Sequence, residues 1–152
     1  MRATSRSTSY HPRVDDLDRF LIAQDEGYAG ALAELRAGRK EEHWIWWVFP
    51  QLRGLGTSAE SIRYGIASRR EAQAYAAHPV LGARLRECAA VLLALDAGSI
   101  QDILPSEIDV RKLRSSMTLF GAVTGEPLFG QVIDRWLEGE RDDRTRQMLA
   151  GG

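Results

Sequence analysis

Three tryptophans fall within four residues of one another in the segment Glu42–Gln51, whose sequence is EHWIWWVFPQ. A simple amphipathic helix keeps its large apolar side chains on one stripe, which Trp44, Trp46 and Trp47 cannot share. The segment must therefore be buried on all sides, or one of its faces must line a pocket. Pro50 is expected to end a short helix here, because the residue before a proline is pushed away from helical geometry.

Helical periodicity recurs along the rest of the chain, and no run of five or more residues alternates clearly as a β-strand would. The strongest pattern covers residues 80–95, whose apolar side chains lie near one broad stripe. Ser68 begins a capping box, Gly38 is a typical helix end, and Asp15 or Asp16 is expected to cap the first helix. Besides a short helix in the tryptophan segment, the segments that we expect to be helical are 17–37, 59–67, 69–78, 80–95, 100–104, about 107–120, 128–137 and 144–149.

These patterns predict an all-α fold, a single compact domain of about seven to nine short to medium helices. The domain is expected to cover residues 15–149, since a chain of 152 residues suits one full-sized core. Residues 1–14 are polar, carry three arginines and no acidic residue, and are expected to form a flexible tail. They lack the apolar core of a secretory signal, and no window of the chain is apolar enough to span a membrane.

A net charge of −1 argues against a protein that binds duplex nucleic acid, because such proteins usually carry a basic surface. The single cysteine, Cys88, lies in an apolar run and is expected to be a buried structural thiol, which fits a cytoplasmic location. Three scattered histidines and one cysteine do not make a metal site, and no cofactor motif is present. We therefore expect no metal, no cofactor, no membrane association and no nucleic-acid duplex as a partner, while the oligomeric state stays open.

A first candidate site combines Lys40, His43, Trp44, Trp47 and Gln51. On a helix, His43 shares a face with Trp47, and Lys40 shares one with Trp44. Indole planes beside a cation and an amide suit a flat ligand such as a nucleotide base, whose stacking on an aromatic ring contributes about 1–3 kcal/mol. The alternative is a buried aromatic cluster in which His43 bonds to a backbone carbonyl.

A second candidate site lies on the helix predicted from about residue 107, where Asp109, Lys112 and Ser116 share one face and Ser115 lies at its edge. An ammonium group with hydroxyls could hold a phosphate or a carboxylate. The residue types also allow a serine–lysine nucleophile pair, although the K-x-x-S spacing is not a diagnostic motif. The alternative is a helix face on which Lys112 pairs with Asp109 and the serines permit close packing.

A third candidate is the glycine loop GLGTS, residues 54–58, which leads into a predicted helix. Such a loop could bind an anion through backbone N–H groups and the helix dipole. It lacks the full phosphate-binding loop pattern, because no lysine follows the second glycine. The alternative is an ordinary loop with Ser58 as the N-cap of the next helix.

Several strings of the sequence resemble a known family. They include HWIWWVFPQLRGLG at residues 43–56, HPVLGARLREC at residues 78–88 and KLRSSMTLF at residues 112–120. With them the chain resembles, over roughly residues 15–149, a bacterial family of domains of unknown function, number 1810. The resemblance implies an all-helical domain in the cytosol and implies no activity. Some members carry the label calpastatin, but calpain inhibitors of that name are long, disordered and poor in aromatic residues, unlike this chain.

The function that these residues favour is the binding of a small nucleotide-like or phosphorylated metabolite in a pocket shared by the first two sites. Trp44 or Trp47 would stack on the ligand, Lys112 would contact its negative charge, and Ser115 or Ser116 would orient it. No motif argues for catalysis, so enzyme activity stays open.

Two alternatives use the same residues differently. The chain could be a protein-interaction or regulatory module without catalytic activity, which predicts an exposed apolar patch around Trp136 on the helix at residues 128–137. In the other alternative, the tryptophan segment and the lysine–serine face only build the core.

Overall fold

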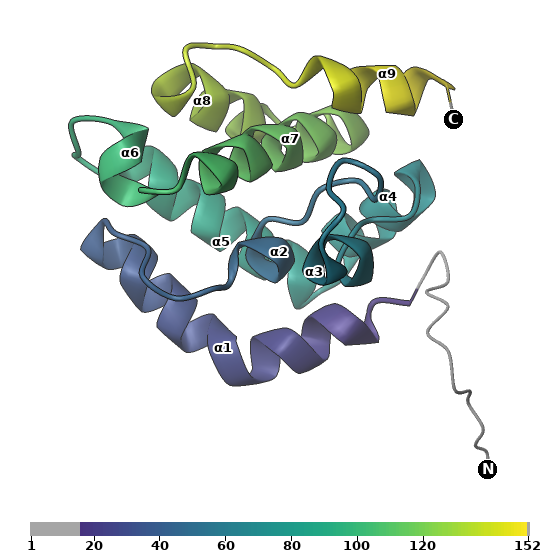
Figure 1. Ribbon diagram of the computed structural model, residues 1–152, viewed down its shortest axis with the longest axis horizontal. Coiled ribbons are helices and arrows are strands. Elements are labelled where there is room, and N and C mark those ends of the chain that lie inside the picture. Colours follow the sequence, from purple (N-terminus) through teal and green to yellow (C-terminus); the bar gives the residue numbers. More distant parts are fainter. Residues whose placement is uncertain (1–15, 152) are drawn as a thin grey trace.

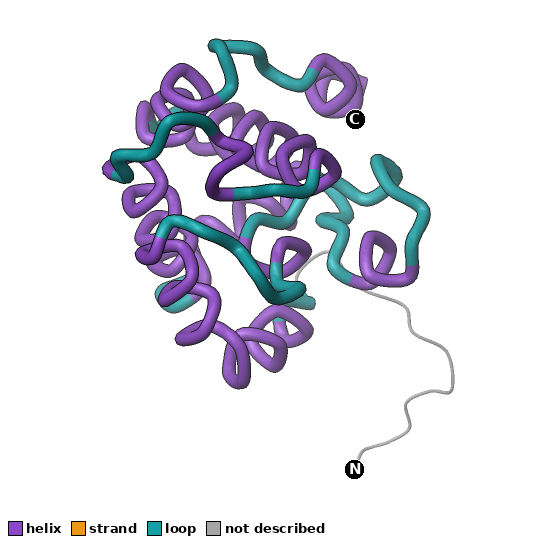
Figure 2. The backbone as a smooth tube through the Cα atoms, turned by 60° about the vertical axis from the view of Figure 1, so that its left-hand side comes forward, coloured by secondary structure: helices purple, strands orange, loops and turns teal. Residues whose placement is uncertain are grey.

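The computed structural model describes residues 16–151, and within them the chain forms helices and no strand (Figure 1 and Figure 2), which confirms the all-α prediction. The segment 1–14, predicted to be a flexible tail, lies outside the described residues. No helix in this part of the chain is both long and apolar enough to cross a membrane. The helices are α1 (Asp18–Ala37), α2 (Ile45–Val48), α3 (Ala59–Arg63), α4 (Arg69–Ala77), α5 (Leu81–Ala94), α6 (Ile100–Ile103), α7 (Glu107–Thr124), α8 (Pro127–Trp136) and α9 (Asp143–Gly151).

Glycines end the two longest helices, because glycine adopts positive φ without a steric penalty. Gly38 follows α1 with φ of 83°, as predicted, and Gly125 follows α7 with φ of 71°. Helix α7 continues to Thr124, beyond the predicted end at about residue 120, and Gly125 ends it. At the start of α4, Ser68 Oγ accepts a hydrogen bond of 3.1 Å from the N–H of Glu71, which confirms the predicted cap.

The predicted cap of α1 is wrong as far as the structure describes it. Asp15 lies outside the described residues, and the N-cap is Leu17, which has no capping side chain. Asp16 contributes its backbone carbonyl, which accepts a hydrogen bond from the guanidinium of Arg19. The start of α1 is thus held by a side chain inside the helix instead of by a carboxylate before it.

Helix α3 ends at Arg63, earlier than the predicted end at residue 67, because the next residues pair with the loop after α2. The N–H of Ile66 donates to the carbonyl of Gln51 at 2.8 Å, and the Ile66 carbonyl accepts from the N–H of Arg53 at 2.8 Å. These bonds accompany an isolated parallel bridge between Leu52 and Ile66. Backbone groups bonded in this way cannot also extend the helix.

Helix α7 forms the centre of the core. It packs against α8, α4, α9 and α2, and the consecutive residues Ser115–Phe120 are all buried. Figure 1 shows α7 crossing the molecule between α1 on one side and α8 and α9 on the other. A helix whose side chains are covered in every direction is expected at the centre of a helical domain.

The tryptophan segment forms the one-turn helix α2, which ends before Pro50 as predicted. Trp44 is only 2% exposed, and its Nε1 donates a hydrogen bond of 2.7 Å to Glu34 Oε1. Trp46 and Trp47 are partly exposed and line different hollows of the surface. The segment therefore contributes both to the core and to two separate faces.

Trp136 was expected to centre an exposed apolar patch under the protein-interaction alternative, but it is only 7% exposed. Its Nε1 donates a hydrogen bond of 2.8 Å to the carbonyl of Leu92. Helix α8 packs against α7 and α5, so its apolar face is part of the core. The expectation of a patch at this position is wrong, because burial of that face is what holds α8 in place.

A buried ion pair fixes the start of α1 against α4. Arg19 Nη2 lies 2.8 Å from Glu71 Oε1, and both side chains are almost completely inaccessible to solvent. The guanidinium also donates to the carbonyls of Arg63 at 2.8 Å and Gly65 at 2.9 Å, and Glu71 accepts from the N–H of Ala67 at 2.8 Å. Both charges are fully hydrogen-bonded. Their bonds tie the segment between α3 and α4 to helix α1, through Arg19, and to helix α4, through Glu71.

Arg19→Leu is expected to lower the free energy of unfolding by about 3–5 kcal/mol, because it leaves the Glu71 carboxylate buried without its partner. Chemical denaturation at neutral pH measures the effect. The control is Arg36→Leu, which removes an ion pair with Glu87 whose side chains are 60% and 42% exposed. That control is expected to change the free energy by less than about 1 kcal/mol, so equal effects of the two variants would contradict the role of the buried pair.

Candidate functional site

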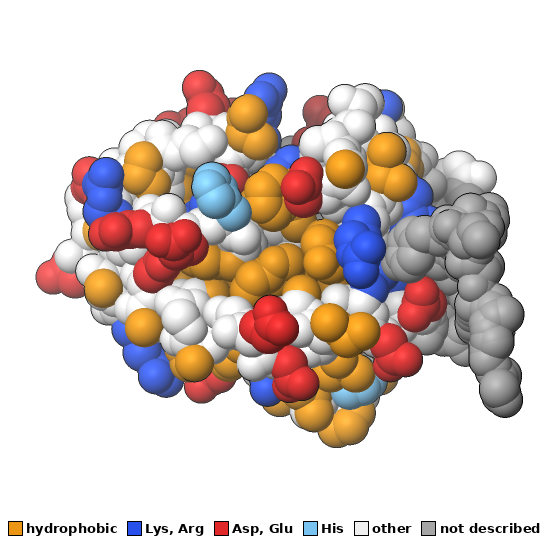
Figure 3. Space-filling view, turned by 60° about the horizontal axis from the view of Figure 1, so that its bottom comes forward, with side chains coloured by type: hydrophobic (Ala, Val, Ile, Leu, Met, Phe, Trp, Pro, Cys, Tyr) orange, Lys and Arg blue, Asp and Glu red, His pale blue; other side chains and the backbone are white. Residues whose placement is uncertain are grey.

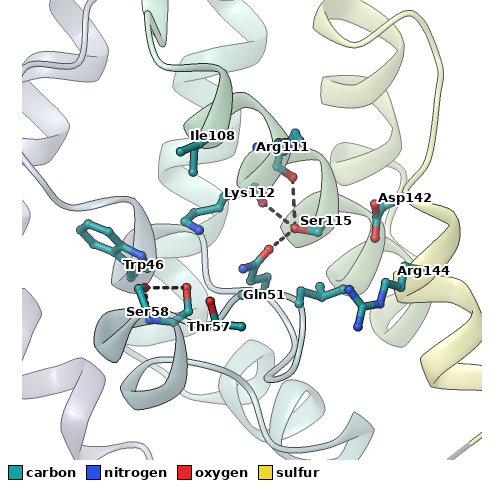
Figure 4. A pocket seen from close by; sticks show the side chains of 13 residues that line it. Trp46, Gln51, Thr57, Ser58, Ile108, Arg111, Lys112, Ser115, Asp142 and Arg144 are labelled. Carbon is teal, nitrogen blue, oxygen red and sulfur yellow. Dashed lines mark hydrogen bonds between the residues drawn. The ribbon is translucent and has the colours of Figure 1, made fainter.

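A cleft of about 560 Å³ opens between the loop after α2, the first half of α7 and the start of α9 (Figure 4). Ligand pockets in proteins typically enclose about 300–1,000 Å³, so this cleft has room for a small metabolite. The residues that line it are Trp46, Gln51, Leu55, Gly56, Thr57, Ser58, Ser61, Ile108, Arg111, Lys112, Ser115, Asp142 and Arg144.

The loop at residues 51–58 forms one wall of the cleft because short contacts hold it against α3. A Cβ atom at Gly56 would lie 2.5 Å from Ser61 Oγ, so only glycine permits this approach without a shift. Gly54 has φ of 104°, a conformation that glycine adopts without strain. Ser58 caps α3 by accepting a hydrogen bond of 3.1 Å from the N–H of Ser61. The glycine loop noted in the sequence thus supplies a wall of the cleft and, as predicted, a cap.

Ser115 fixes the orientation of the Gln51 side chain. Ser115 Oγ donates a hydrogen bond of 2.5 Å to Gln51 Oε1, and the serine is only 3% exposed. With its oxygen turned toward Ser115, the amide directs Nε2 toward the glycine loop, 3.6 Å from where a Cβ would stand on Gly56. Along residues 16–151 Nε2 has no hydrogen-bond partner, so it is a donor that remains available to a ligand.

Positive charge predominates around the cleft. Arg111, Lys112 and Arg144 line it, and among the described lining residues Asp142 is the acidic one. The Asp142 carboxylate accepts from the N–H and the hydroxyl of Thr145, at 2.8 Å and 2.5 Å, and so caps α9. An anion in the cleft would face three cations and one carboxylate, so the balance of charge favours it.

The surroundings of Lys112 perturb its pKa. Partial burial lowers the pKa of Lys112 below its ordinary value of 10.5, and the charge of Arg111 acts in the same direction. Asp109 opposes this shift, but its carboxylate already lies 2.9 Å from the ammonium of Lys40. A bound anion beside Lys112 would favour its charged form and relieve this imbalance.

Trp46, Leu55 and Ile108 give the cleft an apolar wall. Trp46 Nε1 is buried and has no hydrogen-bond partner within the described part of the chain. A buried donor without a partner costs about 1–3 kcal/mol, so an acceptor atom at this edge would stabilise the protein. A small hollow of about 10 Å³, close to the space that one water needs, is lined in part by Trp46, Gln51 and Lys112.

The cleft has the donors of a binding site but, among the described residues, no activated nucleophile. Ser115 gives its proton to an amide oxygen, which is not a base at neutral pH. Its hydroxyl also lies 3.1 Å from the Lys112 carbonyl, and no contact joins it to the Lys112 ammonium. Within residues 16–151 no group of three or more His, Cys, Asp or Glu side chains could hold a metal ion.

The structure brings together three of the side chains selected from the sequence. Gln51, Lys112 and Ser115 all line the cleft, and the loop and α7 bring them there from distant parts of the chain. Ser116, the next residue on α7, points into the core instead: it is completely buried, and its Oγ has no partner among the described residues.

The other selected side chains lie elsewhere. Lys40 pairs with Asp109, and its ammonium lies 5.4 Å from the ring centroid of Trp44. Trp44, His43 and Trp47 line a separate hollow of about 190 Å³ against α1. The structure therefore does not place Trp44 or Trp47 in the cleft with Lys112: the Trp47 ring packs against α1 at Gly27, and Trp44 Nε1 bonds to Glu34 of α1.

Sequence reasoning missed Trp46, Arg111 and Arg144 as lining residues. Trp46 belongs to the tryptophan segment, but helical pairing of its neighbours drew attention to Trp44 and Trp47. Arg111 is adjacent to Lys112 and could have been included by proximity. Arg144 comes from α9, near the end of the chain, and no local pattern connects it with the other residues of the cleft.

Comparison with other proteins shows which family and which solved structure the chain is similar to. Residues 14–149 match a family described as "Protein of unknown function (DUF1810)". The chain is also similar to the conserved hypothetical protein Rv1873 from Mycobacterium tuberculosis, known from a crystal structure, with 47% sequence identity and a TM-score of 0.86. The similarity covers 90% of this chain and 97% of that chain. No curated protein matches the chain significantly.

Lys112→Met, which removes the charge and keeps a long side chain, is expected to stabilise the unliganded protein slightly at neutral pH. Because the pKa of Lys112 is lowered on folding, the unfolded chain binds this proton more tightly than the folded protein does. The charge of Lys112 therefore lowers the free energy of unfolding. This loss of stability is complete at pH values below the pKa that Lys112 has in the folded protein, and it disappears as the pH rises from that pKa to 10.5. Since the side chain is half-exposed, the gain is expected to stay below about 1 kcal/mol.

Melting temperatures of the two proteins at about pH 7 and about pH 11 test this expectation. The variant should melt higher at the lower pH and lose that advantage at the higher one. An advantage that does not change with pH would show that hydrophobic packing, and not the charge, is responsible.

Proposed function

Because the chain belongs to the family described as "Protein of unknown function (DUF1810)", whose description states no activity, we propose a function from the cleft itself. The cleft binds a small nucleotide-like or phosphorylated metabolite. The observation that carries this proposal is the convergence of Arg111, Lys112, Arg144 and the Gln51 amide around one cleft that also has an indole wall.

Each part of such a ligand has a counterpart in the cleft. Lys112 and the two arginines suit the phosphate oxygens, since charge-assisted hydrogen bonds are the strong ones. Gln51 Nε2, oriented by Ser115, donates to an acceptor near the glycine loop. Trp46 is the ring on which a base or another flat group stacks, the role that the sequence suggested for Trp44 or Trp47.

The proposal is one of binding without bond cleavage, since the Ser115 hydroxyl lies against an amide oxygen and not against a base. It includes a cytoplasmic location, because Cys88 is a free, buried thiol, and free thiols are typical of a reducing compartment. A duplex nucleic acid is not part of the proposal, since the net charge is −1.

Isothermal titration calorimetry with AMP, ADP and ADP-ribose tests the proposal, with adenosine and inorganic phosphate as separate arms. At least one nucleotide is expected to bind more tightly than adenosine or phosphate alone, because both halves of the cleft are then used. Lys112→Ala is expected to weaken that binding about tenfold, the loss of one charge-assisted hydrogen bond.

The matched control for Lys112→Ala is Arg70→Ala, which also removes one positive charge but lies exposed on α4, outside the cleft. It is expected to leave the affinity unchanged. Absence of binding by every compound at millimolar concentration would sink the proposal, as would equal losses in the two variants.

Gln51→Glu tests the orientation of the amide donor. The carboxylate can still accept the hydrogen bond from Ser115, but it replaces the Nε2 donor by an oxygen that repels anions. We expect Gln51→Ala to weaken nucleotide binding about threefold to tenfold and Gln51→Glu to weaken it further. A glutamate variant that binds as well as the alanine variant would show that Nε2 does not face the ligand. Thermal melting of both variants checks that the loop is still folded.

A further inference from the structure

A second hollow lies on the face that carries α1. It has a volume of about 190 Å³ and is formed between α1 and the tryptophan segment. We call it the Trp47 notch; its lining residues are Gly27, Gly30, Ala31, Glu34, Glu42, His43, Trp44 and Trp47. Figure 3 shows hydrophobic side chains gathered in a hollow on this face, with a histidine and acidic side chains at one end. The notch shares none of its lining residues with the cleft beside α7.

The aromatic floor of the notch is held in place. The carbonyl of Trp47 accepts hydrogen bonds from Gln24 Nε2 at 2.7 Å and from Tyr75 Oη at 3.3 Å. The Trp47 ring lies against α1 at Gly27, where a Cβ atom would be only 2.4 Å from its Cη2. One turn further along α1, a Cβ on Gly30 would meet no atom within 4 Å, so the notch is open at that point.

The rim of the notch carries two carboxylates, those of Glu34 and Glu42. Neither Glu34 nor Glu42 has an ion-pair partner within residues 16–151. Burial raises the pKa of Glu34, but hydrogen bonds from the N–H of Glu41, from Trp44 Nε1 and from the N–H of Glu42, together with the positive charge of Lys40, outweigh it, so the net shift is downward. Glu34 is therefore ionised at neutral pH.

We propose that the Trp47 notch receives an arginine side chain from a basic segment of a partner polypeptide. The volume of about 190 Å³ is below the 300–1,000 Å³ typical of metabolite sites and suits one long side chain. A guanidinium is planar, stacks on an indole face and donates a pair of hydrogen bonds to a carboxylate. Trp47 supplies the face and Glu42, exposed at the rim, supplies the carboxylate.

The nearest competing cation is already engaged. Lys40, which comes just before Glu42 in the chain, has its ammonium 2.9 Å from Asp109 and only 8% of its side chain exposed. It pairs with Asp109 on α7, and its charge also acts on Glu34, so Glu42 is the rim carboxylate left for an incoming cation. An incoming guanidinium would therefore meet the Glu42 carboxylate and an aromatic face, the combination that favours cations in water-accessible sites.

The probe is a glycine–serine heptapeptide with a single central arginine, and the readout is the indole N–H resonance of Trp47 in two-dimensional ¹⁵N NMR. We expect a saturable shift of this resonance, with smaller shifts at Gly27 and Gly30 and none at Gln51. The same peptide with citrulline in place of arginine, which keeps the shape and removes the charge, is expected to give no shift.

Two variants test the place and the charge separately. Gly30→Leu fills the notch from a position where the side chain meets open space, and leucine favours helix more than glycine does, so the fold is kept while the shift is lost. Glu42→Gln removes a rim charge and is expected to weaken binding about twofold to fivefold. No saturable shift, a shift that survives Gly30→Leu, or tighter binding of choline than of the arginine peptide would overturn the proposal.

Discussion

Burial of the second half of α7 is the constraint on which the rest of the structure depends. The six consecutive residues Ser115–Phe120 are all buried from solvent. Because their side chains point in every direction around the helix, each side of the helix needs a neighbouring element to cover it. Helices α8, α4, α9 and α2 provide that cover. Each large apolar side chain that is fully buried contributes about 1.5–3 kcal/mol, and these contacts therefore decide how the surrounding helices are placed.

The cleft is a consequence of that arrangement. The first half of α7 reaches beyond the helices that enclose the second half, and it brings Lys112 to the surface beside the loop at residues 51–58. Ser115 stands at the boundary, almost fully buried yet bonded to Gln51 at 2.5 Å. One rigid helix thus belongs both to the core and to the cleft, which fixes the lysine relative to the loop.

The cleft also holds groups that the fold leaves unsatisfied. The lowered pKa of Lys112 costs stability, as does Nε1 of Trp46, which has no partner among the described residues, and a sequence selected for stability alone would avoid both. The Trp47 notch is lined by acidic residues, whereas the cleft is lined mainly by cations. Both hollows use a tryptophan of helix α2. Helix α2 therefore directs Trp44 into the core, Trp46 toward a cationic cleft and Trp47 toward an acidic notch.

The sequence by itself determined the all-helical fold, most helix positions, the caps at Ser58 and Ser68, and the end at Gly38. These features depend on residues close together in the chain, where periodicity and capping are visible. Residue chemistry also singled out Gln51, Lys112 and Ser115, which the structure places in one cleft.

Only the tertiary structure decided which tryptophan faces that cleft and which cations accompany Lys112. A single helical turn points its side chains in all directions, so no period can tell Trp46 from its neighbours. The contact between Gln51 and Ser115 spans 64 positions, and Arg144 comes from a separate helix. Such contacts depend on how buried helices pack against one another, and local pattern does not encode that packing.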